Sequence, residues 1–212
     1  KAEIVLGSSF QFNKDYQLDI MKLAQKSTIN RGLRSMQEIA RDIKNATISQ
    51  LLYPLMQVAD IKHLKVDVAE GGLEQRKVHM IGKDLKDILK YDFVAVHTPL
   101  ITSLKGPGQK MSRSIPGTGI SVLDSSSTIA KTIKNAYCPE KIVENNPILQ
   151  IAKLIIFPEI KEIKISRPEK FGGNLEFSIY SELEKAYASG NLHPLDLKNA
   201  VVEYLEKIIS PI

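Results

Sequence analysis

The sequence has 212 residues, of which 43% are hydrophobic and 25% are charged, and its formal net charge is +5. This composition is ordinary for a folded soluble protein with a substantial core. A single cysteine excludes an internal disulfide framework and fits a reducing compartment, and no apolar run approaches the roughly 20 residues of a membrane span. The basic balance permits a polyanionic partner but does not require one.

The chain opens with a predicted strand and two predicted helices. Residues 2–6 form a short apolar run that ends at Gly7, which is typical of a buried strand leaving a sheet. Helical spacing of apolar residues then predicts helices over residues 15–29 and 33–44.

The most informative stretch runs over residues 53–80. Tyr53, Gln57 and Asp60 are four and three residues apart, so they share one face of a predicted helix. The residues around them are apolar, and a helix that is apolar nearly all round is usually buried. We therefore expect these three polar side chains to be buried and to need partners, and a ligand is one such partner.

Strand and helix patterns alternate after this helix. Apolar residues predict strands over 65–70 and 93–97, with a helix over 73–90 between them. Together with the first strand, this order indicates a parallel sheet with helices on its faces, which binds ligands beyond the carboxyl ends of its strands. Gly71 and Gly72 lie at such an end, where the missing Cβ lets a ligand approach the backbone.

Residues 104–120 are rich in glycine and proline, which predicts a long loop. Its basic and hydroxyl side chains suit phosphate binding beside a ligand edge, although a plain linker fits the composition equally well. Strand patterns mostly stop after residue 121. The later predicted elements are helices near 128–137, 147–157, 180–189 and 195–209 and one short strand within 161–167.

Several motifs together resemble one family. The sequence KMSRS at 110–114 resembles the KMSKS signature of class I aminoacyl-tRNA synthetases. The longer pattern YPLMQVADI…VDVAEGGLEQRKVHM over 53–80 is similar to tyrosyl-tRNA synthetases of the archaeal and eukaryotic type. The similarity continues at HTPLI (97–101), AYCP (136–139), NP (146–147), RPEKFGG (167–173) and HPLDLKNAV (193–201). It covers essentially the whole chain.

The resemblance implies an α/β fold in two domains. Residues 1–120 match the C-terminal half of a Rossmann-like class I catalytic domain, with the KMSRS loop over 104–120, and residues 121–212 match a mainly α-helical anticodon-binding domain. Class I synthetases carry an HIGH-type motif after the first strand, and this sequence has none; the HMIG at 79–82 lies inside a predicted helix. We therefore expect a chain that lacks its N-terminal part, and no aminoacylation by a protein of only this length.

The implied activity is that of a tyrosine–tRNA ligase, which forms tyrosyl-adenylate from tyrosine and ATP and transfers the tyrosyl group to tRNA(Tyr). Such catalysis needs positioning and stabilisation of phosphoryl charge rather than a covalent enzyme intermediate. Mg²⁺ is expected with ATP, but the sequence indicates no metal site formed by the protein. The family also implies a cytoplasmic homodimer, with the dimer contact around residues 15–44, and no membrane.

Site residues follow from the same resemblance. Asp60 matches the acceptor of the substrate's phenol hydroxyl, and a buried acceptor rejects phenylalanine because it would be left unpaired. Tyr53, Gln57 and Gln75 match the positions that hold the α-ammonium, whose three donors need three acceptors. The ATP positions form a separate set. They are Glu74, which matches a contact to the ATP ribose, and Gly71 and Gly72, which let adenosine lie against the backbone.

The KMSRS residues Lys110, Ser112, Arg113 and Ser114 are implied to clamp the pyrophosphate side of ATP. Arg113 departs from the bacterial signature, which has lysine there, so the charge is kept but its geometry differs.

Five further residues are implied to contact tRNA. Arg76 and Lys77 match a basic pair that faces the acceptor end. Phe171, His193 and Asp196 match anticodon-binding positions, where an aromatic ring stacks on a base and a carboxylate accepts from guanine. From the residues alone, the favoured interpretation of Asp196 is a plain acid at a helix N-terminus.

Two alternatives remain open at this point. One is a non-catalytic tRNA-binding fragment, and the other is an enzyme similar to tryptophanyl-tRNA synthetase. The intact pocket residues Tyr53, Gln57 and Asp60 favour an enzyme, and Asp60 favours a phenol over an indole.

Overall fold

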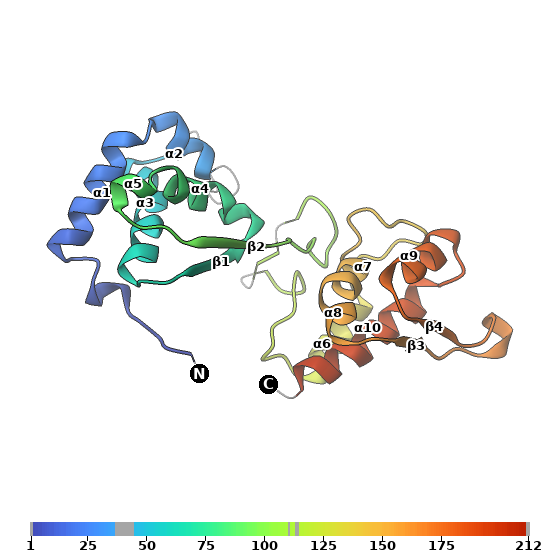
Figure 1. The fold of residues 1–212 in the computed structure, drawn as a ribbon. Coiled ribbons are helices and arrows are strands. Elements are labelled where there is room, and N and C mark those ends of the chain that lie inside the picture. The colour runs from blue at the N-terminus through green and yellow to red at the C-terminus, as the bar shows by residue number, and fades with distance from the viewer. Residues whose placement is uncertain (1, 37–44, 110, 113–114, 211–212) are drawn as a thin grey trace. The chain divides into compact units, whose positions relative to one another are not determined.

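A computed structural model describes residues 2–36, 45–109, 111–112 and 115–210 (Figure 1). The chain divides into two compact units, Lys1–Leu100 and Ile101–Ile212. This division falls before the expected one at residue 120, because the long loop belongs with the second unit, where Leu104 is buried in the core.

Among the residues that the structure describes, the first unit combines helices with a two-stranded sheet (Figure 1). Its elements are η1 (Gly7–Ser9), α1 (Lys14–Lys26), α2 (Ile29–Met36), α3 (Ile48–His63), β1 (Val68–Gly72), η2 (Leu73–Gln75), α4 (Arg76–Asp84), α5 (Lys86–Leu89) and β2 (Val94–Thr98). The predicted helix over 15–29 is confirmed as α1, although it ends at Lys26. The predicted helix over 33–44 begins earlier, as α2, and its residues 37–44 lie outside the described residues.

Helix α3 begins at a capping box. The Oγ1 atom of Thr47 accepts from the Gln50 amide, and the Gln50 side chain accepts from the Thr47 amide at 2.8 Å, so both helix-end donors are satisfied. The helix continues through Pro54 without a break. Its apolar side packs against α1, α2 and α4 around the buried residues Leu55 and Val58.

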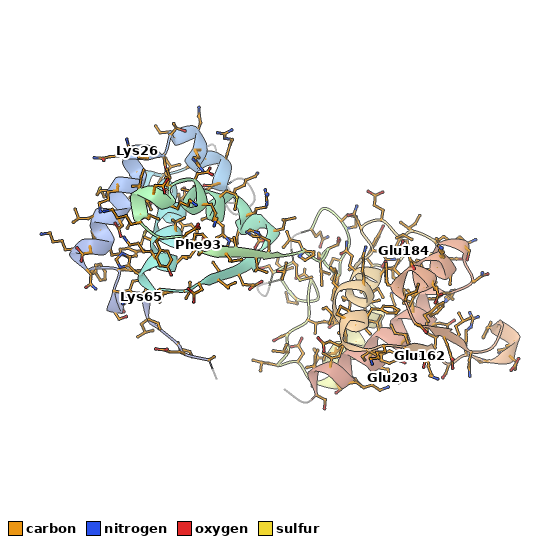
Figure 2. The ribbon with its side chains drawn as sticks, viewed as in Figure 1. Lys26, Lys65, Phe93, Glu162, Glu184 and Glu203 are labelled. Carbon is orange, nitrogen blue, oxygen red and sulfur yellow. The ribbon has the colours of Figure 1, made fainter. Side chains whose placement is uncertain are left out.

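The two strands are parallel, in a register that places Gly71 opposite His97. One face of this sheet packs through Ala69 against a buried cluster that includes Phe93, which lies in the interior while Lys26 and Lys65 lie at the surface (Figure 2). The other face is exposed. Its apolar side chains, each 43% exposed or more, are Val68, Val94 and Val96. Within the described residues, the expectation of helices on the faces of the sheet is therefore confirmed for one face only.

The predicted strand over residues 2–6 is also wrong. These residues have no regular structure, and the side chain of Ile4 is 90% exposed. A strand requires a hydrogen-bonded neighbour, and the described sheet of this unit contains only β1 and β2. An apolar run by itself does not supply that neighbour.

The second unit is mainly helical (Figure 1). Its elements are α6 (Ser126–Lys134), α7 (Pro147–Ile151), the π-helical segment η3 (Ala152–Ile156), α8 (Phe157–Glu159), β3 (Ile163–Ile165), η4 (Glu169–Phe171), β4 (Leu175–Phe177), α9 (Tyr180–Ser189) and α10 (Pro194–Ile209). All four predicted helical regions are confirmed, and the one over 147–157 consists of three consecutive helical pieces.

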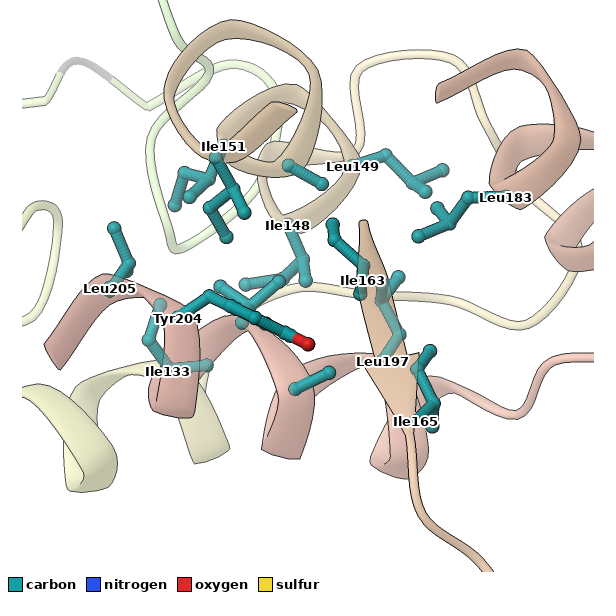
Figure 3. Close-up of a cluster of buried hydrophobic side chains, with 14 of the residues drawn as sticks. Ile133, Ile148, Leu149, Ile151, Ile163, Ile165, Leu183, Leu197, Tyr204 and Leu205 are labelled. Carbon is teal, nitrogen blue, oxygen red and sulfur yellow. The ribbon is translucent and has the colours of Figure 1, made fainter. Parts of the chain in front are cut away.

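The core of the second unit lies between α10 and the segments that cross it. Figure 3 shows Leu197 and Tyr204 of α10 facing Ile148 and Ile163. The Tyr204 hydroxyl accepts from the Lys164 amide at 2.7 Å, which ties the helix to β3. Strand β3 confirms the predicted short strand, and it pairs antiparallel with β4, which was not predicted.

Candidate functional site

The polar face of α3 is less buried than the sequence suggests. Tyr53 is 51% exposed, and Gln57 and Asp60 are partly buried. The helix therefore buries its apolar side, and its polar face stays partly accessible. The expectation that all three polar side chains are buried is corrected in this respect.

Asp60 has partners within the protein. The Tyr16 hydroxyl donates to its Oδ1 atom at 2.8 Å, and the Gln11 Nε2 atom donates to the same oxygen at 3.0 Å. Sequence reasoning missed both donors, because they lie more than forty residues away along the chain. One signal existed: Tyr16 occupies an apolar position of α1, and a buried tyrosine hydroxyl normally has a hydrogen-bond partner.

Gln57 and Gln75 also meet, joined by a short chain of hydrogen bonds. The Nε2 atom of Gln57 donates to the Oε1 atom of Gln75 at 3.1 Å, and the Gln75 amide donates to Glu74 at 3.4 Å. At the two ends of this chain, Gln57 Oε1 and Glu74 Oε2 are buried without a partner among the described residues. Buried acceptors without donors are costly, so this group is suited to a ligand that brings donors.

Gly71 and Gly72 lie at the carboxyl end of β1, as predicted. A Cβ atom at Gly71 would come within 3.2 Å of the Gln75 side chain, and a Cβ atom at Gly72 would overlap the Glu74 carboxylate. A Cβ atom at Gly72 would therefore displace the end of the Glu74 side chain, and one at Gly71 would make a tight contact with Gln75, so both substitutions would disturb the side chains of this site.

A histidine pair lies behind these glycines. The Nδ1 atom of His79, which is 2% exposed, lies 3.0 Å from the Nε2 atom of His97. Burial, and then the neighbouring His97, lower the pKa of His79, so its ring favours the neutral form. An added Cβ at Gly71 would lie 3.6 Å from the His79 ring. The His79 ring therefore packs beside Gly71, and its partner His97 lies opposite Gly71 on β2.

The long loop over 104–120 forms a pocket of about 670 Å³ in the second unit, lined in part by Met111, Ser112 and Thr128. Its fold depends on Thr118, which is fully buried and was not singled out from sequence. The Thr118 Oγ1 atom accepts from the Ser112 amide at 3.0 Å and lies 2.9 Å from the Ser112 carbonyl. Of the KMSRS residues, Lys110, Arg113 and Ser114 lie outside the described residues.

A second pocket in this unit brings three predicted tRNA-binding residues together. Phe171, His193 and Asp196 line a depression of about 600 Å³, and Phe171 is 61% exposed. His193 caps α10 by accepting from the Leu195 amide, and Asp196 lies in the first turn. Arg167, missed from sequence, also lines the pocket and donates to the carbonyl groups of Gly173 and Asn191.

The sequence pattern of the family described as tRNA synthetases class I (W and Y) matches residues 1–210. The chain belongs to this family. The chain is 49% identical to the tyrosine–tRNA ligase of Methanocaldococcus jannaschii and 47% identical to that of Methanoculleus marisnigri, and both matches cover all of the chain. A crystal structure of tyrosyl-tRNA synthetase complexed with L-tyrosine from Archaeoglobus fulgidus matches 99% of the chain at 46% identity and a TM-score of 0.86.

This class I synthetase chain spans about two thirds of the length of the curated relatives, between 66% and 67% of the two named above. It spans 65% of the Archaeoglobus fulgidus structure. The family assignment confirms the resemblance found in the sequence and the α/β fold expected from it. The remaining predicted tRNA residues, Arg76 and Lys77, lie exposed at the start of α4 in this chain.

Two general features complete the description of this synthetase chain. Among the residues that the structure describes, no helix is long and apolar enough to cross a membrane. Within the same residues, no group of three histidine, cysteine or acidic side chains is placed to hold a metal ion.

Proposed function

We propose that the full-length protein is a tyrosine–tRNA ligase, which activates tyrosine with ATP and transfers it to tRNA(Tyr). The observation that carries this proposal is that Asp60 lies one turn along α3 from Gln57, whose side chain bonds to Gln75 and through it connects to Glu74. It is supported by 47–49% identity to two curated tyrosine–tRNA ligases.

The candidate site has hydrogen-bond acceptors at two separated places, which suit the two polar ends of a bound tyrosine. Asp60 lies seven residues, roughly 10 Å, along α3 from Tyr53. This span suits an extended substrate with one polar group at each end. In the proposed complex, Asp60 accepts from the phenol hydroxyl, and Tyr53, Gln57 and Gln75 hold the ammonium. The unpaired Gln57 Oε1 atom then gains the donor that it lacks in the free chain.

ATP is proposed to bind beside this group. Glu74 would accept from the ribose, and adenosine would lie over Gly71 and Gly72. On the pyrophosphate side, the KMSRS cations Lys110 and Arg113 would stabilise the charge that develops on the phosphates, with hydrogen bonds from Ser112 and Ser114. We expect the Mg²⁺ that accompanies ATP to be held largely by phosphate oxygens.

The tyrosine carboxylate would attack the α-phosphate of ATP, and pyrophosphate would leave. No side chain of this chain needs to act as a nucleophile. The contribution of the described residues is to hold the substrate ammonium and hydroxyl so that the carboxylate meets the phosphate in line, which is catalysis by positioning.

Recognition of tRNA is proposed at two places. Arg76 and Lys77 would face the acceptor end, and the pocket of Phe171, His193 and Asp196 would hold an unstacked anticodon base. The aromatic face of Phe171 is exposed, as stacking requires. A homodimer through the helices within residues 15–44 and a cytoplasmic location belong to the same proposal.

The experiment replaces the phenol acceptor. In the full-length protein, Asp60→Ala should lower the ratio of kcat/KM for tyrosine over phenylalanine in ATP–pyrophosphate exchange, because the substrate hydroxyl loses its charged partner. The matched control is Asp67→Ala, which removes an exposed carboxylate from the same unit. A ratio that stays at the wild-type value in Asp60→Ala would refute the role assigned to Asp60. Absence of tyrosine-dependent exchange in the wild-type full-length protein would instead favour a tRNA-binding function without amino-acid selection.

A further inference from the structure

We infer that Tyr16 is a positioning residue for tyrosine selection, because its hydroxyl, aided by Gln11, holds one oxygen of Asp60 and leaves the other directed at the substrate. The inference rests on the proposed role of Asp60 as the phenol acceptor. It goes further by assigning the origin of selectivity to side chains outside α3.

The geometry at Asp60 is asymmetric. Both hydrogen bonds that its carboxylate receives from other side chains in the described residues end on Oδ1, from the Tyr16 hydroxyl at 2.8 Å and the Gln11 amide at 3.0 Å. A carboxyl group rotates easily about its terminal bond when it is free. Two donors on one oxygen fix that rotation, so Oδ2 points in one direction and keeps its capacity to accept.

Tyr16 is held firmly enough to act as this anchor. Its side chain is fully buried, and its ring packs edge-on against Phe10 at 5.7 Å and His63 at 5.1 Å. The single hydroxyl proton has two acceptors, Asp60 at 2.8 Å and the Met56 carbonyl at 3.2 Å. The shorter bond, to the charged group, is the stronger of the two.

The hydroxyl of Tyr16 also stays protonated. Burial raises the pKa of Tyr16 well above its ordinary value, and the hydrogen bond from the hydroxyl to Asp60 raises it further. At neutral pH, Tyr16 is therefore a hydroxyl that donates and not a phenolate. This keeps the Oδ1 side of Asp60 occupied by donors and keeps a second anion away from the carboxylate.

Selectivity follows from this arrangement. A substrate hydroxyl donates to an oxygen that is already oriented, so little ordering cost remains at binding. Phenylalanine in the same place leaves Oδ2 without a donor. Without the Tyr16 anchor, the carboxylate turns away from the substrate, and the advantage of tyrosine over phenylalanine shrinks.

The test is Tyr16→Phe in the full-length protein, which removes one oxygen and keeps the ring. We expect the ratio of kcat/KM for tyrosine over phenylalanine to fall by about tenfold, since one hydrogen bond to a charged group is lost. The lower kcat/KM for tyrosine should come mainly from a higher KM, and the kcat and KM for phenylalanine should change little. Gln11→Met should act in the same direction and serves as the deciding variant if Tyr16→Phe does not fold.

The matched control is Tyr187→Phe, which removes an equally buried hydroxyl from the second unit, where it donates to the Pro139 carbonyl at 2.8 Å. It should leave the ratio unchanged. If Tyr16→Phe or Gln11→Met folds and keeps the wild-type ratio, the inference is wrong while the proposed function stands. If the wild-type protein shows no tyrosine-dependent exchange, the proposed function fails and the inference fails with it.

Discussion

The Nδ1 atom of His79 lies 3.0 Å from the Nε2 atom of His97, which joins α4 to β2 directly beneath Gly71. One ring must donate and the other accept, so the contact requires that at least one ring be neutral. Among the described residues, the acid with a resolved influence on the pKa of His79 is Glu70 of β1, which raises it, and this effect is weaker than those of burial and His97.

This pair predicts a loss of stability on mild acidification. Burial and His97 lower the pKa of His79 from its ordinary value of 6.5. Below that value, the unfolded chain binds a proton at His79 more readily than the folded chain does. The contribution of neutral His79 to the free energy of unfolding is therefore fully present above about pH 6.5, and it falls as the pH drops toward the pKa of His79 in the folded state. Urea unfolding of the full-length protein between about pH 7.5 and about pH 5.5 measures this fall.

The matched variant is His79→Gln, which cannot be protonated in this range. Its stability should depend less on pH than that of the wild type over the same interval. Asp19 does not interfere, because its pKa is lowered from 3.8 by Lys62, His63 and Lys22 against the opposing effect of burial, and it titrates only in stronger acid. Identical pH dependence in His79→Gln and wild type would contradict the prediction.

Gln57→Met should separate binding from stability. Gln57→Met removes a buried oxygen, Oε1, that has no partner in the described part of the chain, and it also removes the hydrogen bond from Nε2 to Gln75, so the two effects oppose each other and the free energy of unfolding should change little. The same change removes an acceptor proposed for the substrate ammonium, and tyrosine affinity should fall by about 10-fold to 100-fold. Calorimetric titration with tyrosine and urea unfolding measure the two effects.

Gln25→Met, on the exposed side of α1, serves as the control for this substitution and should change neither quantity. A large loss of stability in Gln57→Met, with unchanged tyrosine affinity, would show that Gln57 has a structural role only.

Features that depend on residues close together in the sequence were easier to predict than contacts between residues far apart in the sequence. The start of α3 depends on Thr47 and Gln50, three residues apart, and was partly predictable because Thr47 is a typical cap. The bond between Tyr16 and Asp60 joins positions 44 residues apart, and no local pattern encodes such a contact. The family resemblance therefore predicts candidate site residues on α3 and η2, whereas the side chains that contact them, Tyr16 and Gln11, could not be predicted.

Short elements were the least predictable part of the fold. Strand β4 spans only Leu175–Phe177 and exists because β3 lies beside it. The apolar run at residues 2–6 shows the converse, since it has strand-like composition without a partner in the described residues. In both cases the pairing decides the structure, and pairing is not visible in a short sequence window.

Gly82→Ala should destabilise the first unit by about 1–3 kcal/mol. A Cβ atom at Gly82 would lie 2.9 Å from the ring of Phe93 and 3.1 Å from Val58, both of which are buried and unable to move freely. Gly32→Ala is the matched comparison. Its Cβ would lie 3.2 Å from the end of the flexible Leu51 side chain, and the gain in helix propensity should offset the contact.

Urea unfolding of the two glycine variants gives the comparison directly. If Gly82→Ala and Gly32→Ala have equal free energies of unfolding, the packing of Phe93 against α4 leaves room for an added methyl group, and the prediction is wrong.

Phe171→Ala should affect tRNA but not tyrosine activation. The exposed ring lies in the same pocket as Asp196, where it is proposed to stack on an anticodon base, an interaction of about 1–3 kcal/mol. The kcat/KM for tRNA in aminoacylation should therefore fall by roughly 5-fold to 100-fold, with unchanged ATP–pyrophosphate exchange. Ile142→Ala, which removes another exposed apolar side chain of this unit, should change neither rate.

If Phe171→Ala lowers tyrosine-dependent exchange as much as it lowers aminoacylation, the pocket that contains Phe171 also affects tyrosine activation, and its role is not limited to binding tRNA. The proposed division of roles between the two units would then be wrong.

The most direct test of the central claim is ATP–pyrophosphate exchange by the purified full-length protein with each of the twenty amino acids in turn. We predict exchange that depends on tyrosine and is far weaker with phenylalanine and with tryptophan, because only tyrosine offers a hydroxyl to Asp60. Exchange that is equal with tyrosine and phenylalanine, stronger with tryptophan, or absent with all twenty would contradict the account.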